Sequence, residues 1–403
     1  MANAALGKAK EAKNDEFYTV YADIEKEMNA YLEYDENVFR DKTVLLPCDD
    51  PEWSNFTRYF AQNFEKLGLR KLISTSYAIE SKKYKIKDWE PTLFEQQAPW
   101  FDVDKSKIRG KIFTLDHDTN KNGKIDIDDL EWKYLEGDGD FRSDEIKRLR
   151  DEADFIVTNP PFSLFREFVA WIMEAGKQFA VIGNKNAITY KEVFPLIKDN
   201  KIWCGAMPMG VDMLFSVPKE FEDELVKSNK EGSKYRVVDE KIYARAAGVW
   251  FTNIEHGRRH EPLSLMTLKD NLKFSRHKEI KENGYLKYDN YDAIEVPFTD
   301  AIPADYNGVM GVPISFLDKY CPEQFEILGI TKTWFGGANK IYPEQIQVDK
   351  NGKRSQVTKL NDGATLKLAE CPSGETYYIV DSEIYVQVYA RILIKSKNAG
   401  GDA

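Results

Sequence analysis

The sequence Asn159-Pro160-Pro161-Phe162 holds the residues of this chain that are best suited to chemistry. It follows the apolar run 154–158, so an amide oxygen, an imide carbonyl and an aromatic ring stand at the end of an expected buried strand. Proline fixes the backbone and has no N–H, so the side chain of Asn159 and the carbonyl of Pro160 can both serve as acceptors. Two acceptors beside a stacking ring can hold a planar exocyclic amine while a methyl group is transferred to it.

An amine attached to an aromatic ring is a poor nucleophile because its lone pair is delocalised into the ring. Two acceptors that bind its N–H groups favour the pyramidal form, and their effect is greatest where charge develops in the transition state. Phe162 would stack on a base that has left the double helix. We therefore predict Asn159, Pro160, Pro161 and Phe162 as catalytic residues. The alternative is a strand-to-turn connection that merely contains two prolines, and the flanking strand and helix disfavour it.

Strands alternating with amphipathic helices are expected from about residue 42, which is typical of a mostly parallel sheet. The expected strands are residues 43–48, 71–75, 155–158, 179–182, 201–204 and 248–252, with the last two at the far edge. One helix is expected to be capped by Asp50 with Pro51 in its first position. Another is expected to be capped by Ser163 and to turn Phe165, Phe168, Val169 and Ile172 toward the sheet.

A length of 403 residues favours two domains, or one domain with a large appendage. From about residue 262 helices become rare, while turn residues and aromatics dominate. We predict a catalytic domain of residues 1–265 with an insert at about 112–135, followed by a β-rich recognition region of residues 266–403.

The formal net charge of −10 argues against a protein that coats nucleic acid through bulk electrostatics, although it leaves room for local basic surfaces. No apolar run reaches the length of a membrane span, and the N-terminus lacks the apolar segment of an export signal. The four cysteines have no metal-ligand spacing and are expected to be reduced. A cytoplasmic protein without a membrane partner is expected.

The segment from Asp118 to Asp129 resembles a calcium-binding EF-hand loop. The predicted ligands are the side chains of Asp118, Asn120, Asn122 and Asp129 and the carbonyl of Lys124. Gly123 stands at the turn position, and a helix through Trp132 is expected to follow. Asp129 replaces the longer Glu that is usual at the last position, which predicts weak binding or altered geometry. The alternative is a polar surface turn.

Several longer sequence segments, spread over nearly the whole chain, resemble the EcoRI-type family of adenine-N6 DNA methyltransferases. They lie at residues 15–19, 48–56, 137–143, 157–167, 188–194, 305–313, 322–326 and 391–395. Strings of this length in this order are far more specific than the four-residue catalytic motif. The resemblance implies an α/β fold with a Rossmann-like S-adenosylmethionine-dependent methyltransferase domain and a C-terminal β-rich target-recognition region. It also implies transfer of a methyl group from S-adenosylmethionine to a flipped adenine in double-stranded DNA.

The resemblance further implies which residues bind the cofactor. They are Phe17, Tyr18 and Thr19 near the methionine end, Asp49, Asp50, Pro51 and Ser54 in the loop after the first strand, and Asp140 and Phe141 at the adenine. Two departures from the usual pattern stand out. The first loop has no glycine to permit close backbone approach, and the second strand is followed by no acid well placed for the ribose hydroxyls, Glu80 being the nearest.

Alternatives to this function remain open. The same chemistry on cytosine N4, on RNA or on a protein glutamine is the nearest one, although Phe at position 162 favours adenine by analogy with the family. A catalytically silent DNA-binding regulator of the same fold is another, and the intact sequence 159–162 argues against it. We expect a monomer, with a restriction endonuclease of matching specificity as a functional partner rather than a subunit.

Overall fold

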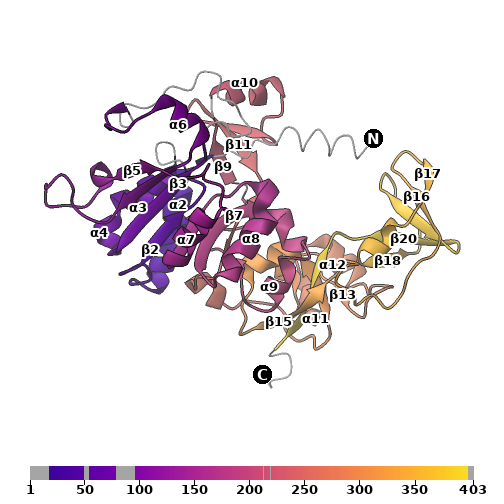
Figure 1. The fold of residues 1–403 in the computed structure, drawn as a ribbon. Coiled ribbons are helices and arrows are strands. Elements are labelled where there is room, and N and C mark those ends of the chain that lie inside the picture. The colour runs from indigo at the N-terminus through magenta and orange to yellow at the C-terminus, as the bar shows by residue number, and fades with distance from the viewer. Residues whose placement is uncertain (1–17, 50–53, 79–95, 212, 218, 398–403) are drawn as a thin grey trace. The chain divides into compact units, whose positions relative to one another are not determined.

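The computed structural model describes residues 18–49, 54–78, 96–211, 213–217 and 219–397. The chain divides into two compact units, labelled by element in Figure 1. The first contains residues 1–187 and 202–257, and the second contains residues 188–201 and 258–403. The second unit therefore begins earlier than residue 266 and takes in a segment from the middle of the first.

An eight-stranded mixed sheet forms the centre of the first unit, in the order β5-β4-β3-β2-β6-β7-β12-β8. The four central strands are parallel: β3 (Lys71–Ser76), β2 (Thr43–Leu46), β6 (Phe155–Thr158) and β7 (Gln178–Asn184). The outer strands pair antiparallel: β4 (Lys111–Leu115), β5 (Glu131–Tyr134), β12 (Gly248–Thr252) and β8 (Trp203–Cys204). All six strands expected from the sequence are present, with β12 and β8 at one edge as predicted.

Helices cover both faces of this sheet. Because side chains alternate along a strand, Val44 and Leu46 face one side and Leu45 the other. The first side forms a core with α2 (Tyr21–Tyr34) and α3 (Asn55–Gln62). On the second side lie α7 (Asp144–Glu152) and α8 (Phe165–Glu174), where the rings of Phe165 and Phe251 are 5.0 Å apart. The unit is thus a layered α/β structure.

The order of the strands reverses between β2 and β6. From β2 the chain passes to β3 on one side, and after β4, β5 and α7 it returns as β6 on the other side of β2. In open α/β sheets, ligands bind outside the carboxyl ends of the strands at such a switch point. Asp49, just after β2, and Asn159, directly after β6, stand at this position.

Two helices begin later than the sequence predicts. α3 starts at Asn55, and its N-cap is Ser54, whose hydroxyl accepts the N–H of Phe56 at 3.1 Å. Ser54 therefore takes the capping role that we had predicted for Asp50, which lies outside the described residues, as does Pro51. Ser163 is not a cap, because it lies in a 3-10 turn, η3 (Phe162–Leu164), that precedes α8.

The helix predicted after the loop 118–129 is also wrong, because that segment is the strand β5. Within it Trp132 is buried while its neighbours Glu131 and Lys133 are exposed. This two-residue alternation suits a strand that covers one face of a sheet. The apolar spacing had favoured a helix only because the pairing with β4 is not visible in the sequence.

A smaller antiparallel sheet completes the first unit, in the order β1-β9-β11-β10. Its strands are β1 (Tyr18–Thr19), β9 (Met213–Ser216), β11 (Lys241–Ala246) and β10 (Tyr235–Val238). The helix α10 (Lys219–Lys227) follows β9. This sheet anchors β1, because Thr19 pairs with Phe215.

The second unit is rich in strands, as predicted. One sheet has the order β13 (Ile294–Glu295), β14 (Met310–Pro313), β21 (Arg391–Ser396), β15 (Phe325–Ile330). The other has the order β17 (Arg354–Val357), β16 (Gln345–Val348), β19 (Tyr377–Val380), β20 (Glu383–Gln387), β18 (Thr365–Leu368). Its α-helices are short: α9 (Phe194–Lys198), α11 (Leu268–Phe274) and α12 (Lys278–Asn283). No helix in the described ranges of the chain is long and apolar enough to cross a membrane.

Gly139 brings the loop 137–140 into contact with the end of β3. Its φ is +87°, and a Cβ atom at this position would lie 2.3 Å from the carbonyl oxygen of Ser76. The amide of Ala78 donates to the carbonyl of Asp138 at 2.8 Å in the same contact. Glycine therefore serves both the left-handed backbone and the close approach, and it sets Asp140 beside the end of β3.

We predict that Gly139→Ala lowers the free energy of unfolding by about 2–4 kcal/mol. The left-handed conformation costs a residue with a Cβ about 1–2 kcal/mol, and displacement of the Ser76 backbone adds to this. Chemical denaturation measures the change. Gly176→Ala is the control, because Gly176 also has a positive φ but a Cβ added there would meet nothing within 4 Å. Equal losses in the two variants would contradict a role for the close approach.

Candidate active site

Asp49 joins the carboxyl ends of three central strands. Its carboxylate accepts the hydroxyl of Ser54 at 2.7 Å and that of Thr158 at 2.6 Å. Its main-chain carbonyl accepts the hydroxyl of Ser74 at 2.8 Å. The residue is 6 % exposed, so these bonds replace the water that a buried carboxylate would otherwise need. The ends of β2, β3 and β6 and the start of α3 are held together by this one residue.

The predicted catalytic residues leave β6 directly after Thr158. Pro160 is buried, while Asn159, Pro161 and Phe162 are half-buried. The ring of Phe162 packs at the edge of the core that β2, α2 and α3 share. The structure therefore brings all four residues to the carboxyl edge of the sheet, next to the Asp49 contacts.

Thr19, in the strand β1, lies against the start of α3. The side-chain amide of Asn55 donates to the carbonyl of Thr19 at 2.8 Å. The hydroxyl of Thr19 is buried and makes no hydrogen bond to the described part of the chain. Tyr18 pairs with Ser216 in the smaller sheet. Phe17, like Asp50 and Pro51, lies outside the described residues.

Asp140 is held in place by Arg142. One carboxylate oxygen accepts the main-chain amide of Arg142 at 2.8 Å and its Nε at 2.9 Å, and the other accepts Nη2 at 2.5 Å. The hydrogen bonds from Arg142 lower the pKa of Asp140 below its usual value. An ionised, well-anchored acceptor therefore stands beside the end of β3.

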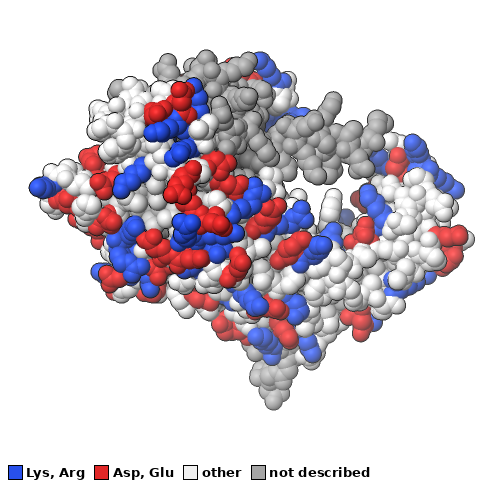
Figure 2. All heavy atoms as spheres, viewed as in Figure 1, with Lys and Arg blue, Asp and Glu red and all other residues white. Residues whose placement is uncertain are grey.

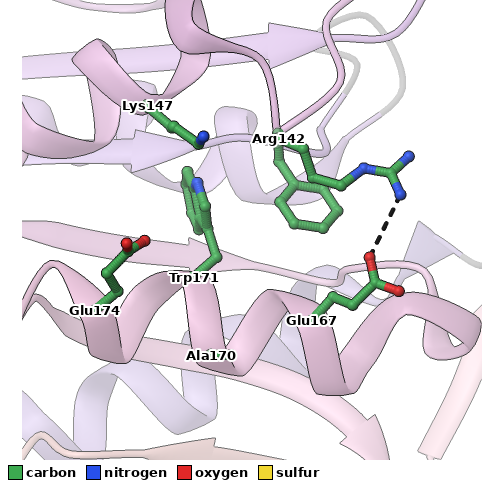
Figure 3. Close-up of a pocket in the computed structure, with 7 residues that line it drawn as sticks. Arg142, Lys147, Glu167, Ala170, Trp171 and Glu174 are labelled. Atoms are coloured by element: carbon green, nitrogen blue, oxygen red, sulfur yellow. Dashed lines mark hydrogen bonds and ion pairs between the residues drawn. The ribbon is translucent and has the colours of Figure 1, made fainter.

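Phe141 points into an aromatic cluster. Its ring is 1 % exposed and lies 5.1 Å from the ring of Phe168 and 5.7 Å from that of Trp171. A surface pocket of about 480 Å³ borders this cluster. It is lined by Phe141, Arg142, Lys147, Glu167, Ala170, Trp171 and Glu174 (Figure 3). Arg142 reaches Glu167 across it at 3.4 Å, and none of the residues 159–162 lines it.

Cys48 and Tyr77 are two neighbours of the site to which the sequence analysis assigned no role. Burial and the carboxylate of Asp49 raise the pKa of the Cys48 thiol well above its usual value. Burial, Cys48 and Asp140 raise the pKa of Tyr77. Both groups therefore keep their protons at neutral pH. The signal that was overlooked is position, because Tyr77 directly follows β3, where we had looked only for an acid.

The loop 118–129 is closed by hydrogen bonds to its own backbone. The carboxylate of Asp118 accepts the amides of Lys121 at 2.6 Å and Gly123 at 2.8 Å. The carboxylate of Asp129 accepts the amides of Thr119 at 2.9 Å and Asp126 at 3.1 Å. Among the residues that the structure describes, no group of three or more His, Cys, Asp or Glu side chains is placed to hold a metal ion.

Residues 5–397 match the family model described as adenine-specific methyltransferase EcoRI. The chain belongs to the EcoRI family of adenine-specific methyltransferases. The type II methyltransferase M.EcoRI of Escherichia coli is 42% identical over 331 residues, which are 82% of this chain and 90% of that relative. The type II methyltransferase M.MpnI of Mycoplasma pneumoniae is 34% identical over 324 residues, 80% of this chain and 84% of the relative. No solved structure gives a significant match.

Membership of the EcoRI family confirms the assignment made from the sequence strings. This member of the family is accordingly an enzyme, a site-specific DNA methyltransferase that acts on adenine.

We predict that Thr158→Val lowers the free energy of unfolding by about 1.5–3 kcal/mol. The substitution keeps the shape of the side chain but removes a hydroxyl that donates to the buried Asp49 carboxylate. Thr158→Ser is the control, since it retains the hydroxyl. Thermal and urea unfolding of both variants measure the effect, and a Val variant as stable as the Ser variant would show that the bond is unimportant.

Proposed function

We propose that this methyltransferase transfers a methyl group from S-adenosylmethionine to N6 of an adenine that has been flipped out of duplex DNA. The observation that carries the proposal is the placement of residues 159–162 at the switch point of the sheet, directly after Thr158 and its bond to Asp49. A base inside a duplex cannot reach such an edge, so it must leave the stack.

In this mechanism the side chain of Asn159 and the carbonyl of Pro160 accept the two N–H groups of the adenine amine. They hold the nitrogen lone pair out of conjugation with the ring and stabilise the positive charge that develops on it. Phe162 stacks on the base and limits its orientation. The cofactor supplies an activated methyl group. Two prolines in succession keep these acceptors rigid, so little reorganisation is needed during the reaction.

The described residues at the edge of the sheet suit a nucleoside-containing cofactor. Buried hydroxyls normally have partners, yet those of Thr19 and Tyr77 make no well-formed hydrogen bond to the described residues. Asp140 adds an anchored carboxylate. We propose that the cofactor lies along the ends of β2 and β3 of a Rossmann-like sheet, held by Tyr18, Thr19, Asp49, Ser54, Asp140 and Phe141, together with Phe17, Asp50 and Pro51.

We propose that the second unit reads the DNA target. Exposed side chains suited to base or backbone contacts include Trp334, Ile341 and Tyr389, which is 90% exposed.

The surface charge of the first unit is mixed. Figure 2 shows Lys and Arg interspersed with Asp and Glu on the face that carries α7 and α8, without a large area of one sign. Such a surface favours local contacts over general attraction to the phosphate backbone. The enzyme would act as a cytoplasmic monomer, with a matching restriction endonuclease as a functional partner.

We predict that Asn159→Ala lowers the rate of methyl transfer by about 100-fold or more, by analogy with the removal of one stabilising group from a transition state. Its affinity for S-adenosylmethionine should stay close to that of the wild type. Incorporation of labelled methyl groups into DNA measures the rate, and equilibrium binding of the labelled cofactor is the control. Near wild-type transfer would contradict the role of Asn159, while cofactor binding without transfer in the wild type would favour a silent DNA-binding protein.

We also propose weak calcium binding by the loop 118–129. The side chains of Asp118, Asn120 and Asn122 accept amides of this loop, which keeps their oxygens close to its backbone. The carbonyl of Lys124 and the carboxylate of Asp129 are the other two ligands of the proposal. Calorimetric titration is expected to give heat with a dissociation constant of about 10⁻⁴–10⁻³ M. Asp118→Ala should abolish that heat. A flat titration, with a melting temperature unchanged by chelator, would remove the proposal.

A further inference from the structure

We infer that the hydroxyl of Tyr77 binds the ribose of the cofactor and replaces the acid that commonly follows the second strand of such sheets. The inference rests on the proposed function, because it assumes that S-adenosylmethionine occupies the edge formed by β2, β3 and β6.

The position of Tyr77 is the first argument. It directly follows β3, which pairs in parallel with β2. Tyr77 therefore lies at the end of the strand next to the one that leads to Asp49. In nucleotide-binding sheets of this kind, an acidic side chain about 20 residues after the first loop binds the ribose hydroxyls. The residues after β3 here read Tyr77-Ala78, so a phenol stands where a carboxylate is usual.

The surroundings of Tyr77 are the second argument. The loop 137–140 lies against it, because a Cβ on Gly139 would come within 3.2 Å of the Cα of Tyr77 and the amide of Ala78 donates to the carbonyl of Asp138 at 2.8 Å. Asp140, expected at the cofactor's adenine, is therefore a neighbour. Cys48, just after β2, also lies close and raises the pKa of the phenol.

The hydroxyl itself is the third argument. It is buried, and it makes no well-formed hydrogen bond to the part of the chain that the structure describes, although the amide of Phe141 and the thiol of Cys48 lie close enough to influence its pKa. A buried hydroxyl without a partner costs free energy, and its presence points to a partner supplied by a ligand. Because burial raises the pKa of Tyr77, the hydroxyl keeps its proton and can both donate to and accept from a ribose hydroxyl.

Tyr77→Phe tests the inference, since it removes one oxygen atom and keeps the ring. The dissociation constant of S-adenosylhomocysteine, measured by calorimetry on the full-length protein, is expected to rise about 5–10-fold. The KM for S-adenosylmethionine should rise similarly, while kcat at saturating cofactor stays within about twofold. Tyr134→Phe is the matched control, because Tyr134 lies in the same sheet but donates to the carbonyl of Asp102 at 2.8 Å. That variant should bind the cofactor as the wild type does.

Analogues of S-adenosylhomocysteine that lack the 2′- or the 3′-hydroxyl complete the test. The wild type should bind at least one analogue more weakly than it binds S-adenosylhomocysteine. Tyr77→Phe should bind that analogue and S-adenosylhomocysteine with similar affinity, since the substitution and the missing hydroxyl remove the same bond. The inference alone would be overturned if Tyr77→Phe bound S-adenosylhomocysteine as tightly as the wild type does. It would also be overturned if removing either ribose hydroxyl weakened binding equally in the two proteins. Absence of S-adenosylhomocysteine binding by the wild type would overturn the proposed function as well.

Discussion

The buried carboxylate of Asp49 is the constraint on which the candidate site depends. A charged group removed from water must be compensated by hydrogen bonds, and Asp49 obtains them from Ser54 and Thr158. Satisfying that charge fixes the end of β2 against the end of β6 and against the first turn of α3. The same requirement therefore sets the origin of the segment 159–162. The rigidity of the two prolines is useful only because their starting point is fixed in this way.

A second constraint acts on the neighbouring strand. The close approach of Gly139 to Ser76 draws the loop 137–140 onto the end of β3, and Arg142 then orients the carboxylate of Asp140. The two constraints place polar groups from β2, β3, β6 and the loop 137–140 at one edge of the sheet. This arrangement suits the proposed methyl transfer, since donor and acceptor of the methyl group must meet in one place.

Local patterns in the sequence predicted most of the first unit. Parallel strands covered on both faces need continuous apolar sequence. The buried runs beginning at Thr43, Lys71 and Phe155 could therefore be recognised as strands. Helix starts were less predictable, since Asp50 and Ser54 are equally good caps and only the tertiary contact with Asp49 distinguishes them. The strand β5 was mistaken for a helix because its pairing with β4 is absent from the local pattern.

The contacts that build the site could not be predicted from local pattern at all. Asp49 and Thr158 are separated by 109 residues, and the role inferred for Tyr77 depends on a hydroxyl that makes no well-formed hydrogen bond to the described residues. The residue chemistry of 159–162 predicted the catalytic residues and the family resemblance supplied the expected cofactor residues, but neither assigned a role to Cys48 or Tyr77. The limits of the two units likewise depend on contacts of the segment 188–201 that its sequence does not reveal.

Single-molecule sequencing of genomic DNA from a host that expresses this chain tests the central claim most directly. It reports the modified base and its sequence context together. The account predicts N6-methyladenine at nearly every copy of one short recognition sequence and at no other adenine. Methylation of cytosine N4, or DNA identical to that of the host without the chain, would contradict it.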